Sequence, residues 1–249
     1  MIKHKKKLLI ISISIGLAVA IAVTFITLSV TVWKPKVKTT QEWLNDFKNS
    51  LVSPQDSSEQ KTEKSITITE NETVVAYYYQ LIEIKNQSQG KVAHFEINEE
   101  YPTLETDEFD IYDDYYLIDD IMYMQRKSMG EANQTNFAST IEIFWEVVSE
   151  NLGSASYNFN ESNFTNLQLT HEGKSHKLTA LISEQKKQSF FVGAEDLASM
   201  SEISIAMTYE ESGYYDLTIK YKYQDNQFVT IRVIKSEPTE IEIKDFVQR

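Results

Sequence analysis

The chain has 249 residues, no cysteine and a formal net charge of −13, because 37 acidic residues outnumber 24 basic ones. The first 38 residues hold seven lysines and no acid, so the remainder has 17 basic and 37 acidic residues, a net charge of −20. Such an acidic surface argues against binding to nucleic acid or to anionic lipid headgroups. The lack of cysteine excludes disulfides and a cysteine-linked lipid anchor.

The segment Leu8–Trp33 is an uninterrupted run without a charged side chain. As a helix it is long enough to cross a hydrocarbon core of ~30 Å. A basic stub before an apolar run is how export signals begin, so we expect a single-pass anchor with residues 34–249 outside the cell membrane. Cleavage after Ala20 or Ala22 is the alternative, and the apolar run continuing to Val32 argues against it.

A short helix is predicted next, over residues 40–52. Thr39 and Glu42 have the spacing of a capping box, and apolar side chains then recur at helical spacing from Trp43 to Leu51. The following stretch, Ser53–Lys64, is polar and predicts a loop or tether.

From Ser65 the pattern changes to the alternation of apolar and polar residues that is typical of β-strands. The expected strands are Ser65–Thr69, Val74–Ile84, a strand around Ala93–Ile97, Phe109–Tyr112, Tyr115–Ile118 and Ile121–Arg126. Asp113-Asp114 and Asp119-Asp120 interrupt the last three, and because aspartate tolerates turn geometry we expect a tight hairpin at each pair.

A second helix is predicted over 136–152. Its apolar residues fall on one stripe, and Gly153 stands where a helix-ending glycine belongs. The stripe consists of Phe137, Ile141, Phe144, Trp145, Val148 and Leu152.

Strands resume after this helix and continue to the end of the chain. The expected segments are Leu167–Thr170, Lys177–Ile182, a weaker one at Ser189–Val192, a helical turn at Ala194–Met200, and then Ile203–Tyr209, Tyr215–Tyr223, Phe228–Ile234 and Ile241–Ile243.

The order of these elements predicts an α+β fold, in which a strongly curved antiparallel sheet, or half-barrel, packs on one or two helices after the N-terminal transmembrane helix. Three regions are expected. Residues 1–38 are the cytoplasmic stub, anchor and basic collar, 39–64 the amphipathic helix and tether, and 65–249 the extracytoplasmic β-rich domain.

This order resembles the lipid-carrier half-barrel superfamily, which includes outer-membrane lipoprotein carriers and mycobacterial-type lipid-carrying lipoproteins. The similarity rests on the opening helix Thr40–Val52, the hairpin-rich strands 74–126 with the aromatic stretch 115–124, the helix 136–152, and the strands 203–234 ending near Pro238. The resemblance implies an apolar cavity for acyl chains, with helix 136–152 over its mouth. It carries over no individual binding residue.

Aromatic side chains with a polar tip suit a cavity that is apolar inside and wet at its lip. The candidate ligand-binding residues are Tyr77, Tyr79, Tyr123, Phe137, Ile141, Phe144, Trp145 and Tyr221. Ordinary packing within the sheet is the alternative for each of them.

Sites for metals and catalysis are not supported by any complete pattern. His171 and His176 could face each other across a hairpin, but zinc needs three or four ligands. Asp107–Asp114 could offer oxygens to calcium, without the spacing of a known loop, and a solvated acidic rim is favoured. No Ser–His–Asp set is recognisable. We therefore expect neither metal nor cofactor, and no enzymatic activity.

The sequence thus predicts a membrane-anchored extracytoplasmic binding module of a bacterial cell envelope, with a lipid or other apolar ligand held between sheet and helix. Its partners would be the bilayer, through Leu8–Trp33, and that ligand. The alternative is an envelope interaction or structural protein whose sheet docks a partner protein without any ligand cavity.

Overall fold

The computed structural model describes residues 38–51, 59–88, 90–104, 110–128, 137–152, 156–192, 197–224, 226–244 and 247. Thr40–Arg249 forms one compact unit. The predicted anchor Leu8–Trp33 lies outside the described residues. Among those that are described, no helix is both long and apolar enough to cross a membrane.

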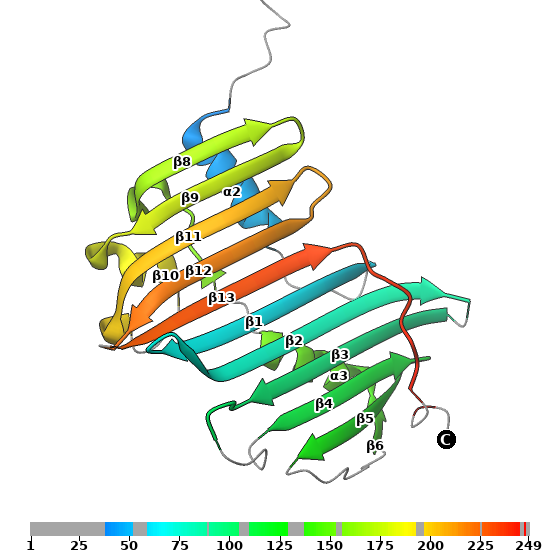
Figure 1. Cartoon of the computed structure of the whole chain (residues 1–249). Helices are drawn as coiled ribbons and strands as arrows, with labels where there is room; N and C mark the ends of the chain where they lie inside the picture. Colours follow the sequence, from blue (N-terminus) through cyan, green and yellow to red (C-terminus); the bar gives the residue numbers. More distant parts are fainter. Residues whose placement is uncertain are drawn as a thin grey trace, which may run out of the picture. The chain divides into compact units, whose positions relative to one another are not determined.

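The unit is built on an open antiparallel sheet with the strand order β6-β5-β4-β3-β2-β1-β13-β12-β11-β9-β8 (Figure 1). Its strands are β1 Gln60–Glu70, β2 Thr73–Gln87, β3 Gly90–Glu100, β4 Ile111–Ile118, β5 Ile121–Ser128, β6 Phe137–Thr140, β8 Phe164–Glu172, β9 Ser175–Ile182, β11 Met200–Glu210, β12 Tyr215–Tyr223 and β13 Gln227–Ser236. Two meanders are therefore joined at one seam, where β1 pairs with β13. A separate small ribbon pairs β7 (Ser156–Tyr157) with β10 (Phe191–Val192).

Each of the two meanders has its own apolar core, and one helix packs into each core. Helix α2 (Thr40–Ser50) buries Leu44 and Phe47 against β9, β11 and β12. Helix α3 (Ile141–Leu152) buries Phe144 and Val148 against β2 to β5. Shorter turns complete the unit, namely α4 Lys187–Phe190, η2 Glu161–Asn163, η3 Glu184–Lys186 and η4 Leu197–Ser199.

Both helices cover the same face of the sheet, which we call the helix face (Figure 1). Lys64 of β1 donates from Nζ to the carbonyl of Asn151 near the end of α3, at 3.3 Å, so its side chain points toward that helix. Alternate residues of a strand share a face. Ile66 therefore shares it too, and Ile66 pairs through Ile231 with Ile219, which belongs to the core that α2 joins.

The opposite face is crossed by the C-terminal segment, residues 237–244, drawn in red in Figure 1. Its Ile241 is buried together with Val92 and Tyr116 in a third apolar cluster. The Tyr116 hydroxyl donates to the carbonyl of Glu242 at 3.2 Å. The predicted strand Ile241–Ile243 is wrong, because this segment bonds to side chains and joins no sheet.

The predicted helix 136–152 is correct only from Ile141 onward. Its first residues form β6, which pairs with β5 from Met124↔Phe137 to Ile121↔Thr140. The edge of β5 has backbone N–H and C=O groups that an extended segment can pair with, whereas a helical turn uses its own backbone groups internally. Pairing with that edge overrides the helical spacing of the apolar stripe.

Of the two predicted aspartate turns, one is confirmed and one is wrong. Asp119 and Asp120 form the turn between β4 and β5 with φ of 51° and 62°, the left-handed geometry of a two-residue hairpin. Asp113 and Asp114 instead lie inside β4. Arg126 pairs with the first and His94 with the second, so each acid has a partner within the sheet.

Candidate functional site

The helix face carries an apolar strip where the two meanders join. Its half-buried side chains come from β1, β13 and β12, and we call them the central strip: Ile66, Ile68, Ile231, Val233 and Tyr221. Ile66 and Ile68 belong to neither of the two helix-covered cores. β-Branched residues favour these strands and at the same time present a smooth apolar surface. The strip therefore lies on the helix face, where Tyr221, Ile231 and Val233 pack at the margin of the α2 core and Ile66 and Ile68 continue the apolar surface toward β2.

Two lysines border the central strip. Lys64 lies beside it on β1, and Lys235 lies beside it on β13, where it pairs with Tyr215. Burial lowers the pKa of each amino group below the usual lysine value, because the charged form loses hydration. These ammonium groups are a local exception to the acidic surface, and they would favour a ligand with an anionic group.

Polar atoms near α3 are also left without partners. Within the part of the chain that the structure describes, Gln80 Oε1 and Trp145 Nε1 are buried and make no hydrogen bond. Gln80 pairs with Lys64 in the sheet and so lies on the helix face. A buried unpaired acceptor or donor costs about 1–3 kcal/mol, and a ligand or water with polar groups would remove that cost.

A cavity of about 230 Å³ lies beside the end of α2. It is lined by Asp46, Asn49 and Ser50 of that helix together with Tyr209, Gly213 and Lys235. Ligand pockets for drug-sized molecules usually exceed about 300 Å³. This cavity alone therefore suits a headgroup-sized molecule.

The predicted ligand-binding residues are divided between the two faces of the sheet. Ile141, Phe144 and Trp145 lie on α3, where Phe144 is fully buried and Trp145 half-buried. Tyr221 belongs to the central strip. Tyr77 and Tyr79 stack on each other on the opposite face, and Tyr123 packs in the third cluster on that face. Phe137 lies in β6.

The histidine pair of the β8–β9 hairpin does face across the strands, as predicted. His171 and His176 pair in register, and their Nδ1 atoms lie 3.0 Å apart. Trp43 of α2 stacks on His171 at 4.1 Å between ring centroids. Glu211 Oε1 lies 3.8 Å from His176 Nε2, but among the described residues this pair belongs to no group of three ligand atoms that lie within 4.8 Å of one another.

The acidic run Asp107–Asp114 is committed to protein partners wherever it is described. Asp110 Oδ1 accepts from a backbone amide at 3.1 Å, and Arg126 binds Asp113 through both carboxylate oxygens. Residues 105–109, where part of the calcium hypothesis falls, lie outside the described residues.

One polar cluster was missed by the sequence analysis. His94 and Glu96 of β3 and Asp114 of β4 gather on the opposite face of the sheet. The His-x-Glu spacing could have indicated two side chains on one face of a strand. The sequence does not indicate the third member, because the Asp113-Asp114 pair predicts a turn and not a position inside a strand.

No protein-family model and no curated protein matches this sequence. Among solved structures, LprF from Mycobacterium bovis is similar over 82% of this chain and 95% of LprF, at 11% sequence identity and a TM-score of 0.33. At this identity and TM-score, the similarity assigns neither a family nor a function.

Proposed function

We propose that the chain is a membrane-anchored, extracytoplasmic and non-enzymatic module that binds an acyl-chain ligand on the helix face of its sheet. In this proposal the sheet curves as a half-barrel, and the ligand lies along the central strip between α2 and α3. The observation that carries the proposal is the strip itself: Tyr221, Ile231 and Val233 are half-buried at the margin of the α2 core, and the half-buried Ile66 and Ile68 belong to neither core.

The chemistry around the strip supports an amphiphile with one anionic group. Apolar side chains would contact the acyl chain, and burial of each methylene contributes roughly 0.8 kcal/mol. Lys64 and Lys235 would pair with a carboxylate or phosphate, and the unpartnered Gln80 Oε1 would accept from a hydroxyl or amide. The anchor Leu8–Trp33 would keep the module at the outer surface of the cell membrane, where such ligands are found.

The second candidate function, docking of an envelope protein, is favoured by a different observation. The opposite face exposes large apolar side chains, among them Phe228 (50% exposed) and Leu181 (43%). By alternation both point away from the helix face, so the two functions would use different surfaces.

Photocrosslinking of the full-length protein in lipid vesicles tests the proposal. The vesicles contain a trace of phospholipid with a diazirine in its acyl chain, and adducts are mapped by mass spectrometry after irradiation. We expect adducts on β1 and β13 peptides as well as on the anchor, which serves as the internal standard.

Two matched variants of β13 and β1 sharpen this test. Ile66→Gln on the helix face should remove the adducts on β1 and β13 while the anchor adducts remain. Phe228→Gln on the opposite face should leave both sets intact. If the wild-type protein is labelled on the anchor alone, the lipid proposal fails and docking through the opposite face becomes the better candidate.

A further inference from the structure

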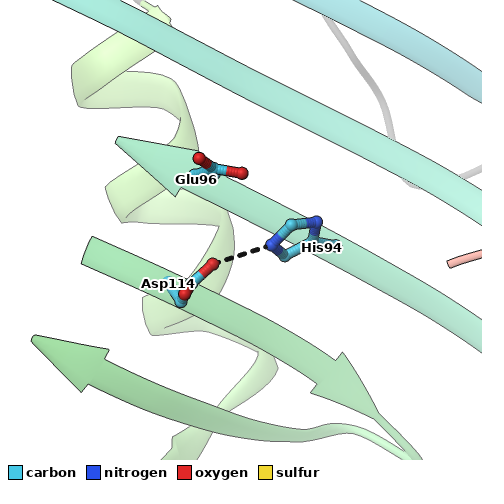
Figure 2. Close-up of side chains that lie close together, drawn as sticks. All are labelled: His94, Glu96 and Asp114. Atoms are coloured by element: carbon cyan, nitrogen blue, oxygen red, sulfur yellow. Dashed lines mark hydrogen bonds and ion pairs between the residues drawn. The ribbon is translucent and has the colours of Figure 1, made fainter. Parts of the chain in front are cut away.

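Three potential metal ligands converge on the face of the sheet opposite the helices. His94 and Glu96 stand two residues apart on β3, and Asp114 on β4 pairs with Glu96 in register. One ligand atom of each lies within 4.8 Å of the other two. Figure 2 shows His94 and Asp114 directed at one another, with Nε2 and Oδ1 3.0 Å apart and Glu96 beside them.

The imidazole is held in place before any ion binds. His94 is only 8% exposed, and its ring stacks on that of Tyr116 at 4.4 Å between centroids. Tyr116 is fixed in turn by its hydrogen bond to the C-terminal segment. Asn98 donates to Glu96 Oε1 at 2.7 Å. Supporting bonds of this kind orient metal ligands and tune their affinity.

The cluster already holds a cation of the protein itself. Lys244 of the C-terminal segment bonds through Nζ to Asp114 Oδ2. Lys244 thus occupies Oδ2 of this carboxylate, whereas Oδ1 remains directed at the buried imidazole of His94.

We propose that His94, Glu96 and Asp114 form a binding site for a divalent transition metal, with Zn²⁺ as the best-suited ion. One imidazole and two carboxylates are a nitrogen and oxygen set that Zn²⁺ accepts, and water would complete the four ligands. In a tetrahedral zinc site with bonds of about 2.0–2.1 Å, two ligand atoms stand about 3.3 Å apart. The 3.0 Å between Nε2 and Oδ1 is close to that separation, so small side-chain shifts would admit the ion.

Lys244 and the ion compete for the same negative charge. A dication bound to Asp114 repels an ammonium group on the other oxygen of that carboxylate. Loss of Lys244 should therefore raise the affinity for the metal. If the only role of the cluster were to hold the C-terminal segment, the same change would weaken that attachment and would bring no gain in metal affinity. This opposite sign separates a metal site from an ordinary ion-pair network.

Zinc titration of the chelator-treated full-length protein in detergent, followed by calorimetry and by competition with a chromophoric chelator, tests the proposal. We expect one tight Zn²⁺ per chain. Asp114→Asn and the half-buried Glu96→Gln should each weaken binding at least tenfold, and Asn98→Ala by about tenfold through the supporting bond. Lys244→Gln should tighten binding several-fold.

The control is His171→Gln, which removes half of the other histidine pair and should leave zinc affinity unchanged. Circular dichroism establishes whether each variant is folded. If a substitution at a more buried position unfolds the chain, the zinc affinity of the half-buried Glu96→Gln variant tests the proposal. A wild-type protein without stoichiometric binding would overturn the proposal. So would binding that His171→Gln abolishes, or an affinity that Glu96→Gln and Asp114→Asn leave unchanged.

Discussion

At the scale of single residues, the pair of Asp113 and Arg126 explains how an acid remains inside a strand. Asp113 is 3% exposed, and Arg126 binds it with Nε at 2.9 Å and the second guanidinium nitrogen at 2.8 Å. The Tyr115 hydroxyl also donates to Asp113 Oδ2, at 3.1 Å. Three donors thus replace the water that the carboxylate loses on burial, so the strand continues where a turn was predicted.

Removal of the arginine should therefore be costly. We expect Arg126→Met to lower the free energy of unfolding by about 3 kcal/mol, because it leaves a buried charge without its partner. The figure is at the low end for buried pairs since the guanidinium itself is half-exposed. Urea unfolding monitored by circular dichroism gives the value.

The chain contains a matched control for this experiment. Arg232 binds Asp216 with the same two-bond geometry, but that pair lies on the surface with side-chain exposures of 51% and 40%. Arg232→Met should cost ~0–1 kcal/mol. Equal losses in the two variants would refute the role assigned to burial of Asp113.

At the scale of elements, α3 shows why a helix that closes a core differs from a lid. Phe144 is fully buried against β2 to β5, whereas its neighbour Trp145 is half-buried and meets it edge to face at 5.2 Å. Only part of the apolar stripe is thus committed to the core. The remainder, Ile141 and Trp145, packs at the margin of that core, and the buried Trp145 Nε1 has no hydrogen-bond partner among the described residues.

Truncation of these two side chains should accordingly have different effects. Phe144→Ala leaves a void and should cost about 3–5 kcal/mol of stability. Trp145→Ala should cost clearly less in the same thermal and urea measurements, and it should reduce the photocrosslinking of acyl chains to β1. A loss of stability as large as that of Phe144→Ala, with crosslinking unchanged, would make Trp145 an ordinary core residue.

Much of the sheet could be predicted from the sequence because its signals are local. Strong alternation marks β11, β12 and β13, and the capping box with its apolar spacing marks α2. The errors concern residues whose conformation depends on distant partners. β6 forms because β5 offers an edge, and Asp114 stays in β4 because His94 meets it from another strand.

The candidate sites were less predictable for the same reason. The central strip combines Ile66 with Ile231, which are neighbours only through the seam of β1 and β13. Tyr77 and Tyr123 are of a residue type expected in a ligand site, but strand register places them on the face of the sheet opposite the helices. Amino-acid type was thus informative, whereas the face depended on register.

At the scale of the whole unit, the C-terminal segment shields a part of the sheet that the helices do not reach. Ile241 covers Val92 and Tyr116, which are 0% and 1% exposed. Thr239 bonds to the Glu83 carboxylate through its hydroxyl at 2.8 Å, and Gln87 donates to the Ile241 carbonyl at 3.1 Å. The segment therefore belongs to the folded structure, although it forms no strand.

A chain that ends after Ser236 should be less stable and should expose more apolar surface. Burial of an isoleucine alone contributes roughly 1.5–3 kcal/mol, so we expect at least this loss in urea unfolding. Binding of an apolar dye should rise as Val92 becomes exposed. The control ends after Val247 and keeps every contact named above. Unchanged stability and dye binding in the shorter chain would show that the segment is dispensable.

The seam between β1 and β13 has a consequence for biogenesis. The chain is synthesised from its N-terminus, so β1 to β6 emerge first, and β13, which pairs with the edge of β1 that β2 leaves open, is the last strand to emerge. Until then the free backbone groups of an 11-residue strand can pair with another nascent chain. The rate of synthesis and the chaperones that meet the nascent chain, more than the stability of the finished sheet, would then decide how much protein matures.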